Sequence, residues 1–239
     1  DTSINDLRSK QNLLVTGIIY PNNVSPEDRI LFESKLFLEI NSKQTNVKSE
    51  LMQEIELIVN PFSPIAISKA VVVELSKSGA LKDKLEEHIF DDGKKIKISS
   101  IISYGLKPLI KKEGDDSLFT HWNEDLKKQE LFTKRNTRDL KEYIDYCASE
   151  INLILNAIKK NSHPSWKVGD EKRILSPTSI NGFLKCLRLI LENNKSRNFD
   201  FYENCTMKIS EFPFSEYKSS HWNRLGVDLY ETYFKEDNT

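Results

Sequence analysis

The sequence "NTRDLKEYIDYCASEINLILNAIKKN", residues 136–161, is the stretch that decides the fold. Its apolar side chains recur at alternating steps of four and three residues: Leu140, Ile144, Cys147, Ile151, Ile154 and Ile158. This spacing matches the a and d positions of a heptad pattern and predicts one apolar seam along a single helix. Asn136, with Asp139 three residues later, is typical of a helix start. Such a seam packs either inside its own chain or against a second chain.

Similar helical patterns lie on both sides of this stretch. "LSPTSINGFLKCLRLILEN" offers Ser176 as an N-cap and Pro177 as the first helical residue. We expect further helices at 26–41, 48–59, 63–78 and 219–234, and a short helical segment at 99–110. In the first of these, Phe32, Leu36 and Ile40 recur at four-residue spacing, which predicts one buried stripe.

The segment Leu13–Tyr20, "LLVTGIIY", is apolar and rich in β-branched residues, and "PNN" closes it. It predicts a buried strand. A lone strand leaves its backbone polar groups without partners. The chain also begins at Asp1 rather than at a methionine. We therefore expect the partner strands either in a preceding part or in strands of this chain that its pattern does not reveal.

Composition narrows the functional classes. The 239 residues include 35 Lys and Arg and 36 Asp and Glu, so the net charge is -1. A dedicated nonspecific DNA-binding protein usually has a surplus of basic residues, and this chain has none. A local basic face remains compatible with these numbers. Only 8 Gly and 8 Pro occur, which favours long helices over a turn-rich β architecture. The absence of a signal peptide and of a long apolar run predicts a cytoplasmic protein without a membrane segment.

The residues that usually perform catalysis form no recognisable motif. The cysteines, Cys147, Cys186 and Cys205, are far apart and the four histidines are scattered, so no metal site is expected. The sequence contains no nucleophile elbow, no Walker A motif and no dinucleotide-binding glycine pattern. We therefore nominate no catalytic residue and rank a nuclease or ATPase activity last.

Two groups of residues are candidates for binding. The basic cluster Lys134, Arg135, Arg138 and Lys141 stands near the start of the long helix, where cations oppose the helix dipole. It is either a phosphate-contacting face or, as we favour, a solvated face paired with Glu130 and Glu142. The tryptophans could stack on bases, although Trp222 lies on a periodic apolar face and core packing is the favoured interpretation for it.

The other candidates are two amides in "FLEINSKQTNV", residues 37–47. Asn41 stands where a helix would end, which explains its presence. Gln44 has no such explanation. Amides both donate and accept hydrogen bonds and stay neutral, so they suit the recognition of base edges or nucleotide groups, or they orient a neighbouring residue.

The surrounding stretch "LFESKLFLEINSKQTNVKSELMQEI", residues 31–55, resembles the region downstream of the signature motif in DGQHR-domain proteins, a family that includes the DndB-type proteins associated with DNA sulfur modification. Ile40, Asn41, Gln44 and Val47 carry the resemblance, and "NPFSPIAISKAVVVELSKSGALKDKL" and "SSHWNRLGVDLYETYF" are also similar. The Asp-Gly-Gln-His-Arg motif itself is absent from this chain.

The resemblance implies a mainly α (α+β) fold. Residues 1–112 would be the C-terminal part of a small α/β, ParB-like domain with a strand near its N-terminus, and residues 118–239 a helical domain. The boundary itself comes from composition: "KKEGDDS", residues 111–117, is charged, contains Gly and lacks apolar residues, which predicts a linker. It also implies a role in DNA modification or phage defence, through nucleotide or DNA binding or transcriptional regulation. Asn41 and Gln44 would then line a pocket that faces a nucleotide or the motif.

The alternative is a helical protein–protein interaction module without catalytic activity. In that case, the helix over Leu140–Ile158 would bind a partner protein or a second copy of the chain.

Overall fold

The computed structural model describes residues 17–41, 49–86 and 95–235, and this part of the chain is built from helices. It contains no strand, only the isolated bridges Leu85–Ile96 and Val168–Leu175. The mainly α prediction is therefore confirmed. Residues 13–16 of the predicted strand lie outside the described residues. Residues 17–20 form no strand, and Ile19 is 96% exposed, so the expectation of a buried strand is wrong for them.

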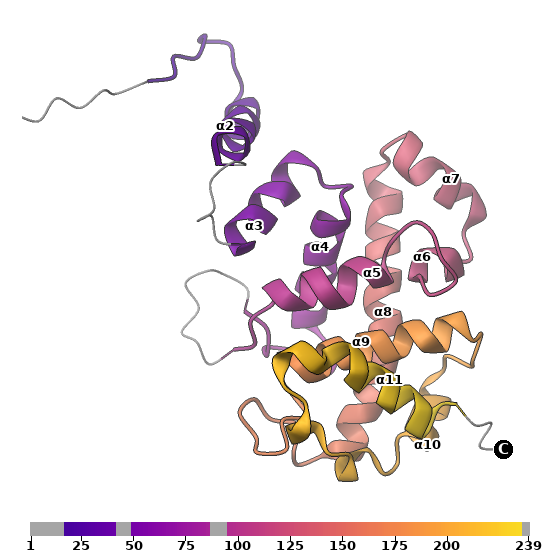
Figure 1. The fold of residues 1–239 in the computed structure, drawn as a ribbon. Coiled ribbons are helices and arrows are strands. Elements are labelled where there is room, and N and C mark those ends of the chain that lie inside the picture. The colour runs from indigo at the N-terminus through magenta and orange to yellow at the C-terminus, as the bar shows by residue number, and fades with distance from the viewer. Residues whose placement is uncertain (1–16, 42–48, 87–94, 236–239) are drawn as a thin grey trace, which may run out of the picture.

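The elements and their order along the chain are shown in Figure 1. They are α2 (Pro26–Asn41), α3 (Ser49–Val59), α4 (Pro64–Lys77), the π-helix η1 (Ile101–Leu106), α5 (Lys107–Leu109), α6 (Leu118–His121), α7 (Asp125–Thr133), α8 (Thr137–Ser162), α9 (Pro177–Glu192), α10 (Phe199–Cys205), the 3-10 helices η2 (Ile209–Glu211), η3 (Phe214–Glu216) and η4 (Ser219–His221), and α11 (Trp222–Tyr233). Each predicted helix is present, with the short segment at 99–110 formed mostly by η1.

Side-chain caps explain where three of these helices begin. The Ser63 hydroxyl accepts from the Ala66 N–H at 3.2 Å, and the Ser176 hydroxyl accepts from the Ser179 N–H at 3.2 Å. Asn136 accepts from two backbone N–H groups at the start of α8. Each cap satisfies donors that the helix leaves unpaired and typically contributes about 1 kcal/mol.

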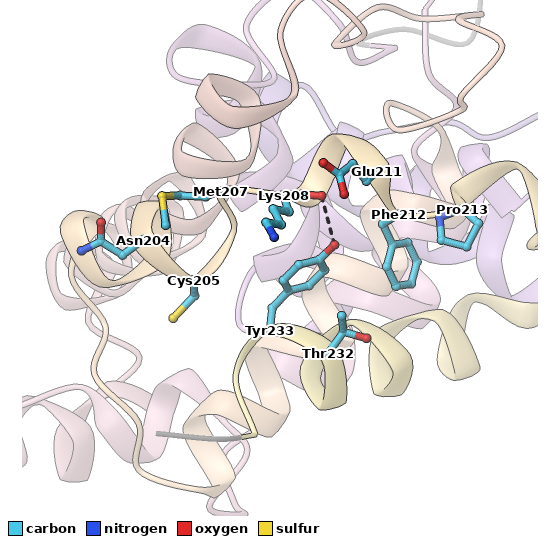
Figure 2. Close-up of a pocket in the computed structure, with 9 residues that line it drawn as sticks. All are labelled: Asn204, Cys205, Met207, Lys208, Glu211, Phe212, Pro213, Thr232 and Tyr233. Carbon is cyan, nitrogen blue, oxygen red and sulfur yellow. Dashed lines mark hydrogen bonds between the residues drawn. The ribbon is translucent and has the colours of Figure 1, made fainter. Parts of the chain in front are cut away.

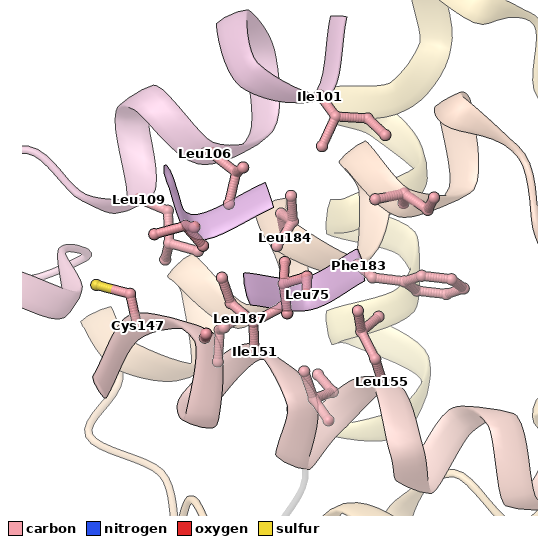
Figure 3. Packing of buried hydrophobic residues seen from close by; sticks show 14 of the residues in the cluster. Leu75, Ile101, Leu106, Leu109, Cys147, Ile151, Leu155, Phe183, Leu184 and Leu187 are labelled. Carbon is pink, nitrogen blue, oxygen red and sulfur yellow. The ribbon is translucent and has the colours of Figure 1, made fainter. Parts of the chain in front are cut away.

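The apolar seam of α8 packs inside the chain. Leu140, Cys147, Ile151, Ile154 and Ile158 are buried, and Ile144 packs against the same cluster. Figure 3 shows α8 residues such as Ile151 and Leu155 beside Leu75 of α4 and Leu187 of α9. The seam is therefore occupied by the chain's own core, and a partner protein or a second copy would have to bind another surface.

Helix α2 is the exception to this close packing. It projects from the rest of the molecule in Figure 1 and packs mainly against α3. Phe32 is 49% exposed and Ile40 is 57% exposed, so the predicted buried stripe of this helix is wrong in the described structure. The four-residue spacing does place them on one helix face, which is only partly covered: the Tyr20 ring packs edge-on against Phe32, with the ring centres 5.9 Å apart.

The predicted linker at 111–117 is a tightly bonded loop. The Lys111 ammonium lies 2.7 Å from an Asp116 carboxylate oxygen, and Arg188 of α9 donates to the other oxygen at 2.9 Å. The Tyr143 hydroxyl donates to the Ile110 carbonyl at 3.1 Å. One cluster of buried apolar residues, from Phe62 to Phe234, includes both sides of this loop. Residues on both sides of the predicted boundary between 1–112 and 118–239 therefore belong to one hydrophobic core.

Among the described residues, no single helix is both long and apolar enough to cross a membrane. Residues 51–59 and α4 satisfy those criteria only when taken together, across a bend of 105°.

The Asp116 contacts predict an acid-dependent loss of stability. Burial raises the pKa of Asp116, but hydrogen bonds from Lys111 and Arg188 outweigh it and hold this pKa below its ordinary value. A lowered folded-state pKa means that the stabilisation is present above the unfolded pKa of about 3.9 and is lost as the pH falls through the folded pKa. We expect Asp116→Asn to cost on the order of 1–2 kcal/mol at neutral pH and progressively less below pH ~4.

Urea unfolding at several pH values measures this difference. Asp115→Asn is the matched control, because it removes the same charge from the exposed neighbouring side chain and should change stability little. A cost for Asp116→Asn that stays constant down to pH ~2 would contradict the assigned role of the carboxylate.

Candidate functional site

The two amides singled out in the sequence are not placed by the structure. Asn41 is the last residue of α2, consistent with its interpretation as a helix end, but its side chain is not described. Gln44 lies outside the described residues. Their role in lining a pocket stays a prediction.

The predicted basic cluster is a solvated face with local partners. Lys134 caps the end of α7 and pairs with Glu130 at 2.6 Å. Arg138 and Lys141, on the first turns of α8, pair with Glu142 at 3.4 Å and Asp145 at 3.1 Å. The pairing with Glu130 and Glu142 is therefore confirmed.

Arg135, the fourth member of the cluster, turns toward α3 and α4. Its guanidinium donates to the Asn60 amide oxygen at 3.3 Å and lies over the Phe62 ring, 4.9 Å from the ring centre. Every cation of the cluster thus has a neighbouring acceptor or ring, and a phosphate would have to displace these partners.

A different set of residues forms a pocket that the sequence did not indicate. The pocket lies where η1, the start of α9 and the start of α11 meet, and its volume is about 430 Å³, within the usual range for small-ligand sites. We call it the Tyr104–Trp222 pocket. Its lining residues are Ser100, Tyr104, Pro177, Thr178, Asn181, Ser219, Ser220 and Trp222.

Two stacked aromatic rings form one wall of this pocket. The centres of the Tyr104 and Trp222 rings are 5.7 Å apart and their planes differ by 18°. Tyr104 is 52% exposed and Trp222 is half-buried, so the core position favoured for Trp222 is wrong. Trp122 and Trp166, in contrast, are buried in the core. The wall therefore offers an aromatic surface to a planar ligand.

The first turn of α9 supplies polar groups to the same pocket. Pro177 has no N–H, Ser176 caps the Ser179 N–H, and the Ile180 N–H bonds to the Ser176 carbonyl at 2.9 Å. The Thr178 N–H is the donor of this turn that has no acceptor in the described part of the chain. An unpaired donor at the positive end of a 16-residue helix favours an anionic group.

Asn181, one turn further along α9, is a second polar group without a partner. The residue is 2% exposed, and its amide oxygen has no hydrogen-bond partner. Buried polar side chains are nearly always hydrogen-bonded, and an unpaired one costs about 1–3 kcal/mol. The unpaired atom is an acceptor, so the ligand group that would complete its hydrogen bonding is a donor and not an anion.

Helix η1 positions Tyr104 by close backbone packing. A Cβ atom at Gly105 would lie 2.5 Å from a Leu184 methyl group and 2.7 Å from the Asn181 amide oxygen, so only glycine fits without a shift. The element is also a π-helix, a rare conformation that occurs frequently at functional sites.

The segments that frame this pocket are basic, although the whole chain is nearly neutral. Residues 95–112, 172–191 and 217–227 contain no Asp or Glu, and all their formally charged side chains are Lys or Arg. Lys97, Lys107 and Lys218 are exposed and form no ion pair within the described structure. The local charge therefore favours an anionic ligand.

A larger pocket, of about 590 Å³, is a weaker candidate (Figure 2). Tyr233 donates to the Lys208 carbonyl at 3.3 Å in its wall, and none of its lining side chains is both buried and unpaired. Burial raises the pKa of the Cys205 thiol in this wall, so the thiolate that a nucleophile needs is disfavoured. This pocket offers surface but no evident chemistry.

In comparisons with known proteins, the chain matches no protein-family model, no curated protein and no solved structure. Its assignment to the DGQHR-domain family stays a prediction.

Proposed function

We propose that this protein acts by binding a nucleotide or a nucleic acid in the Tyr104–Trp222 pocket. The observation that supports this most directly is the stacked, partly exposed aromatic pair beside the open first turn of α9. A base has a flat face that stacks on such rings, and its phosphate is an anion that suits a free helix N–H. The basic segments around the pocket add a favourable field for the same ligand.

The proposed biological setting is DNA modification or defence, and it rests on the resemblance of residues 31–55 to DGQHR-domain proteins. The pocket argument does not use that resemblance, because it rests on the geometry of Tyr104, Thr178 and Trp222. Of these three, only Trp222 lies in a stretch that is also similar to the family. Regulation of transcription would be one consequence of DNA binding in this setting.

A protein–protein interaction module is the second candidate. Its support is the exposed apolar surface at the N-terminal end of the described chain, where Ile19, Phe32 and Ile40 are exposed by 96%, 49% and 57%. Sedimentation at increasing protein concentration separates the two functions, because self-association through this surface would raise the apparent mass without any nucleotide.

Replacing Trp222 tests the proposed binding function. We expect Trp222→Ala to weaken the binding of a labelled oligothymidylate or adenine nucleotide about 10- to 100-fold, since one stacking contact is worth ~1–3 kcal/mol. Fluorescence anisotropy measures the change. Trp222→Phe should keep most of the affinity because it retains an aromatic face.

Met207→Ala is the control for a general effect of surface truncation. Met207 is 67% exposed and lies in the other pocket, so this variant should bind like the unmodified protein. Equal affinity of Trp222→Ala and the unmodified protein, with both variants folded by circular dichroism, would remove the pocket as the binding site.

A further inference from the structure

We propose that the Tyr104–Trp222 pocket takes a single unpaired nucleotide, with its base against the aromatic wall and its phosphate toward the first turn of α9. This inference rests on the proposed function and specifies its substrate class. The ligand would be a nucleotide of single-stranded nucleic acid or a free mononucleotide, which share this chemistry, and base-paired duplex would be excluded.

The shape of the site supports an unpaired base. In a duplex, both faces of each base are covered by neighbouring base pairs, so a protein ring stacks on a base only after that base has left the stack. The aromatic wall of this pocket is part of a cavity of about 430 Å³, formed by three elements, and Tyr104 and Trp222 line it together. A cavity of this size suits one nucleotide unit rather than the surface of a duplex.

The polar groups of the pocket support a phosphate. The start of α9 offers the unpaired Thr178 N–H to a phosphate oxygen. The buried Asn181 amide oxygen is a second, independent group without a partner in the same wall; it is an acceptor, so it suits a donor group of the base or the sugar. Ser219 and Ser220 add exposed hydroxyls from η4. The Thr178 N–H and the two hydroxyls are neutral donors, which suit phosphate oxygens.

The distribution of free cations points to this pocket rather than to the basic cluster. Lys107 follows the pocket residue Tyr104 by three positions, and Lys218 directly precedes Ser219. Both are exposed and form no ion pair within the described residues, whereas Lys134 and Lys141 pair with Glu130 and Asp145. An unpaired lysine can neutralise a phosphate without first breaking an existing pair.

The central experiment adds a negative charge to the pocket and compares it with a neutral side chain of the same size. Ser220 is exposed and lies just before α11, where a carboxylate is favourable for the helix dipole. We expect Ser220→Asp to fold normally and to weaken the binding of oligothymidylate at least tenfold. Ser220→Asn has nearly the same size as Ser220→Asp and no charge, so it isolates the effect of the charge. Ser220→Asp should bind oligothymidylate at least tenfold more weakly than Ser220→Asn, and equal affinities of the two variants would contradict a phosphate at this site.

Three probes identify the substrate class with these variants. Oligothymidylate should bind at least tenfold more tightly than its duplex with oligoadenylate, and competition with thymidine monophosphate shows whether a free nucleotide suffices. Equal affinity for strand and duplex, both weakened by Trp222→Ala, would overturn the unpaired-nucleotide inference and keep the proposed function. Binding of none of the nucleic-acid or nucleotide probes would overturn both.

A pair of lysine variants locates the phosphate contact. The double variant Lys107→Ala, Lys218→Ala should bind oligothymidylate more weakly. Its affinity should also depend less steeply on salt concentration, because fewer counterions are released on binding. Lys134→Ala with Lys141→Ala removes the same charge from the paired cluster and should have little effect. The reverse result would place the phosphate at the basic cluster and overturn the inference for the pocket.

Discussion

Phe183→Ala should lower the free energy of unfolding by about 3–5 kcal/mol, the usual cost of truncating a buried aromatic side chain. Phe183 is 1% exposed and lies in the middle of α9. Its ring centre is 6.3 Å from that of Trp166 and 5.6 Å from that of Phe214, so the ring joins α9 to two loop-rich segments. Truncation would leave a cavity that these backbones cannot close completely.

Chemical denaturation measures the loss for Phe183→Ala. Leu126→Ala is the control, since Leu126 is 78% exposed and its truncation should change stability by less than about 0.5 kcal/mol. Similar small effects for the two variants would mean that Phe183 is not part of a well-packed core. A loss of this size would also reduce ligand binding, because α9 contributes Thr178 and Asn181 to the pocket.

Gly226→Ala should destabilise the protein by about 1–3 kcal/mol, the range found for overpacked cores. In an exposed helix, the same substitution would instead stabilise by about 1 kcal/mol through helix propensity. The sign changes here because a Cβ at Gly226 would lie 2.5 Å from the Lys185 Cβ and 2.7 Å from the Gly182 carbonyl oxygen. A backbone oxygen cannot move aside without separating α9 from α11.

Asn223→Ala is the matched control for Gly226→Ala, because it introduces the same residue into the same helix at an exposed position. It should be neutral or slightly stabilising. Thermal and urea unfolding should show a loss of stability for Gly226→Ala and no loss for Asn223→Ala if α9 and α11 approach as closely as described. A stabilised Gly226→Ala variant would show that α9 and α11 do not approach so closely.

The same crossing links fold to function. α9 holds Thr178 and Asn181, and α11 begins with Trp222, so the distance between these helices sets the width of the pocket. We expect Gly226→Ala to weaken nucleotide binding as well as stability. The nearby Ser220→Asp variant is expected to change binding alone.

Much of the helical framework was predictable, because local interactions determine it. The N-caps Ser63, Asn136 and Ser176 act on N–H groups two or three residues away, and the seam of α8 is a periodic pattern within one helix. Such features depend on residues close in sequence. The pairs of Lys134 with Glu130 and of Arg138 with Glu142 are four-residue contacts on helices and were predictable for the same reason.

The failed predictions concern what covers an apolar face. The stripe with Phe32 and Ile40 has the same kind of periodicity as the seam of α8, yet it is half-exposed in the described structure. Trp222 also follows an apolar period, but its ring stacks on Tyr104 at the surface. Periodicity shows that side chains share a face, and it contains no information about the element that packs on that face.

The sequence by itself thus determined the helical class, most helix starts and the near-neutral charge. Only the tertiary structure decided that the α8 seam is internal and that a pocket exists. Tyr104, Thr178 and Trp222 are far apart in the chain and belong to three different elements. They meet because Gly105, Gly182 and Gly226 let η1, α9 and α11 approach closely, and that approach is a long-range packing result which no local pattern encodes.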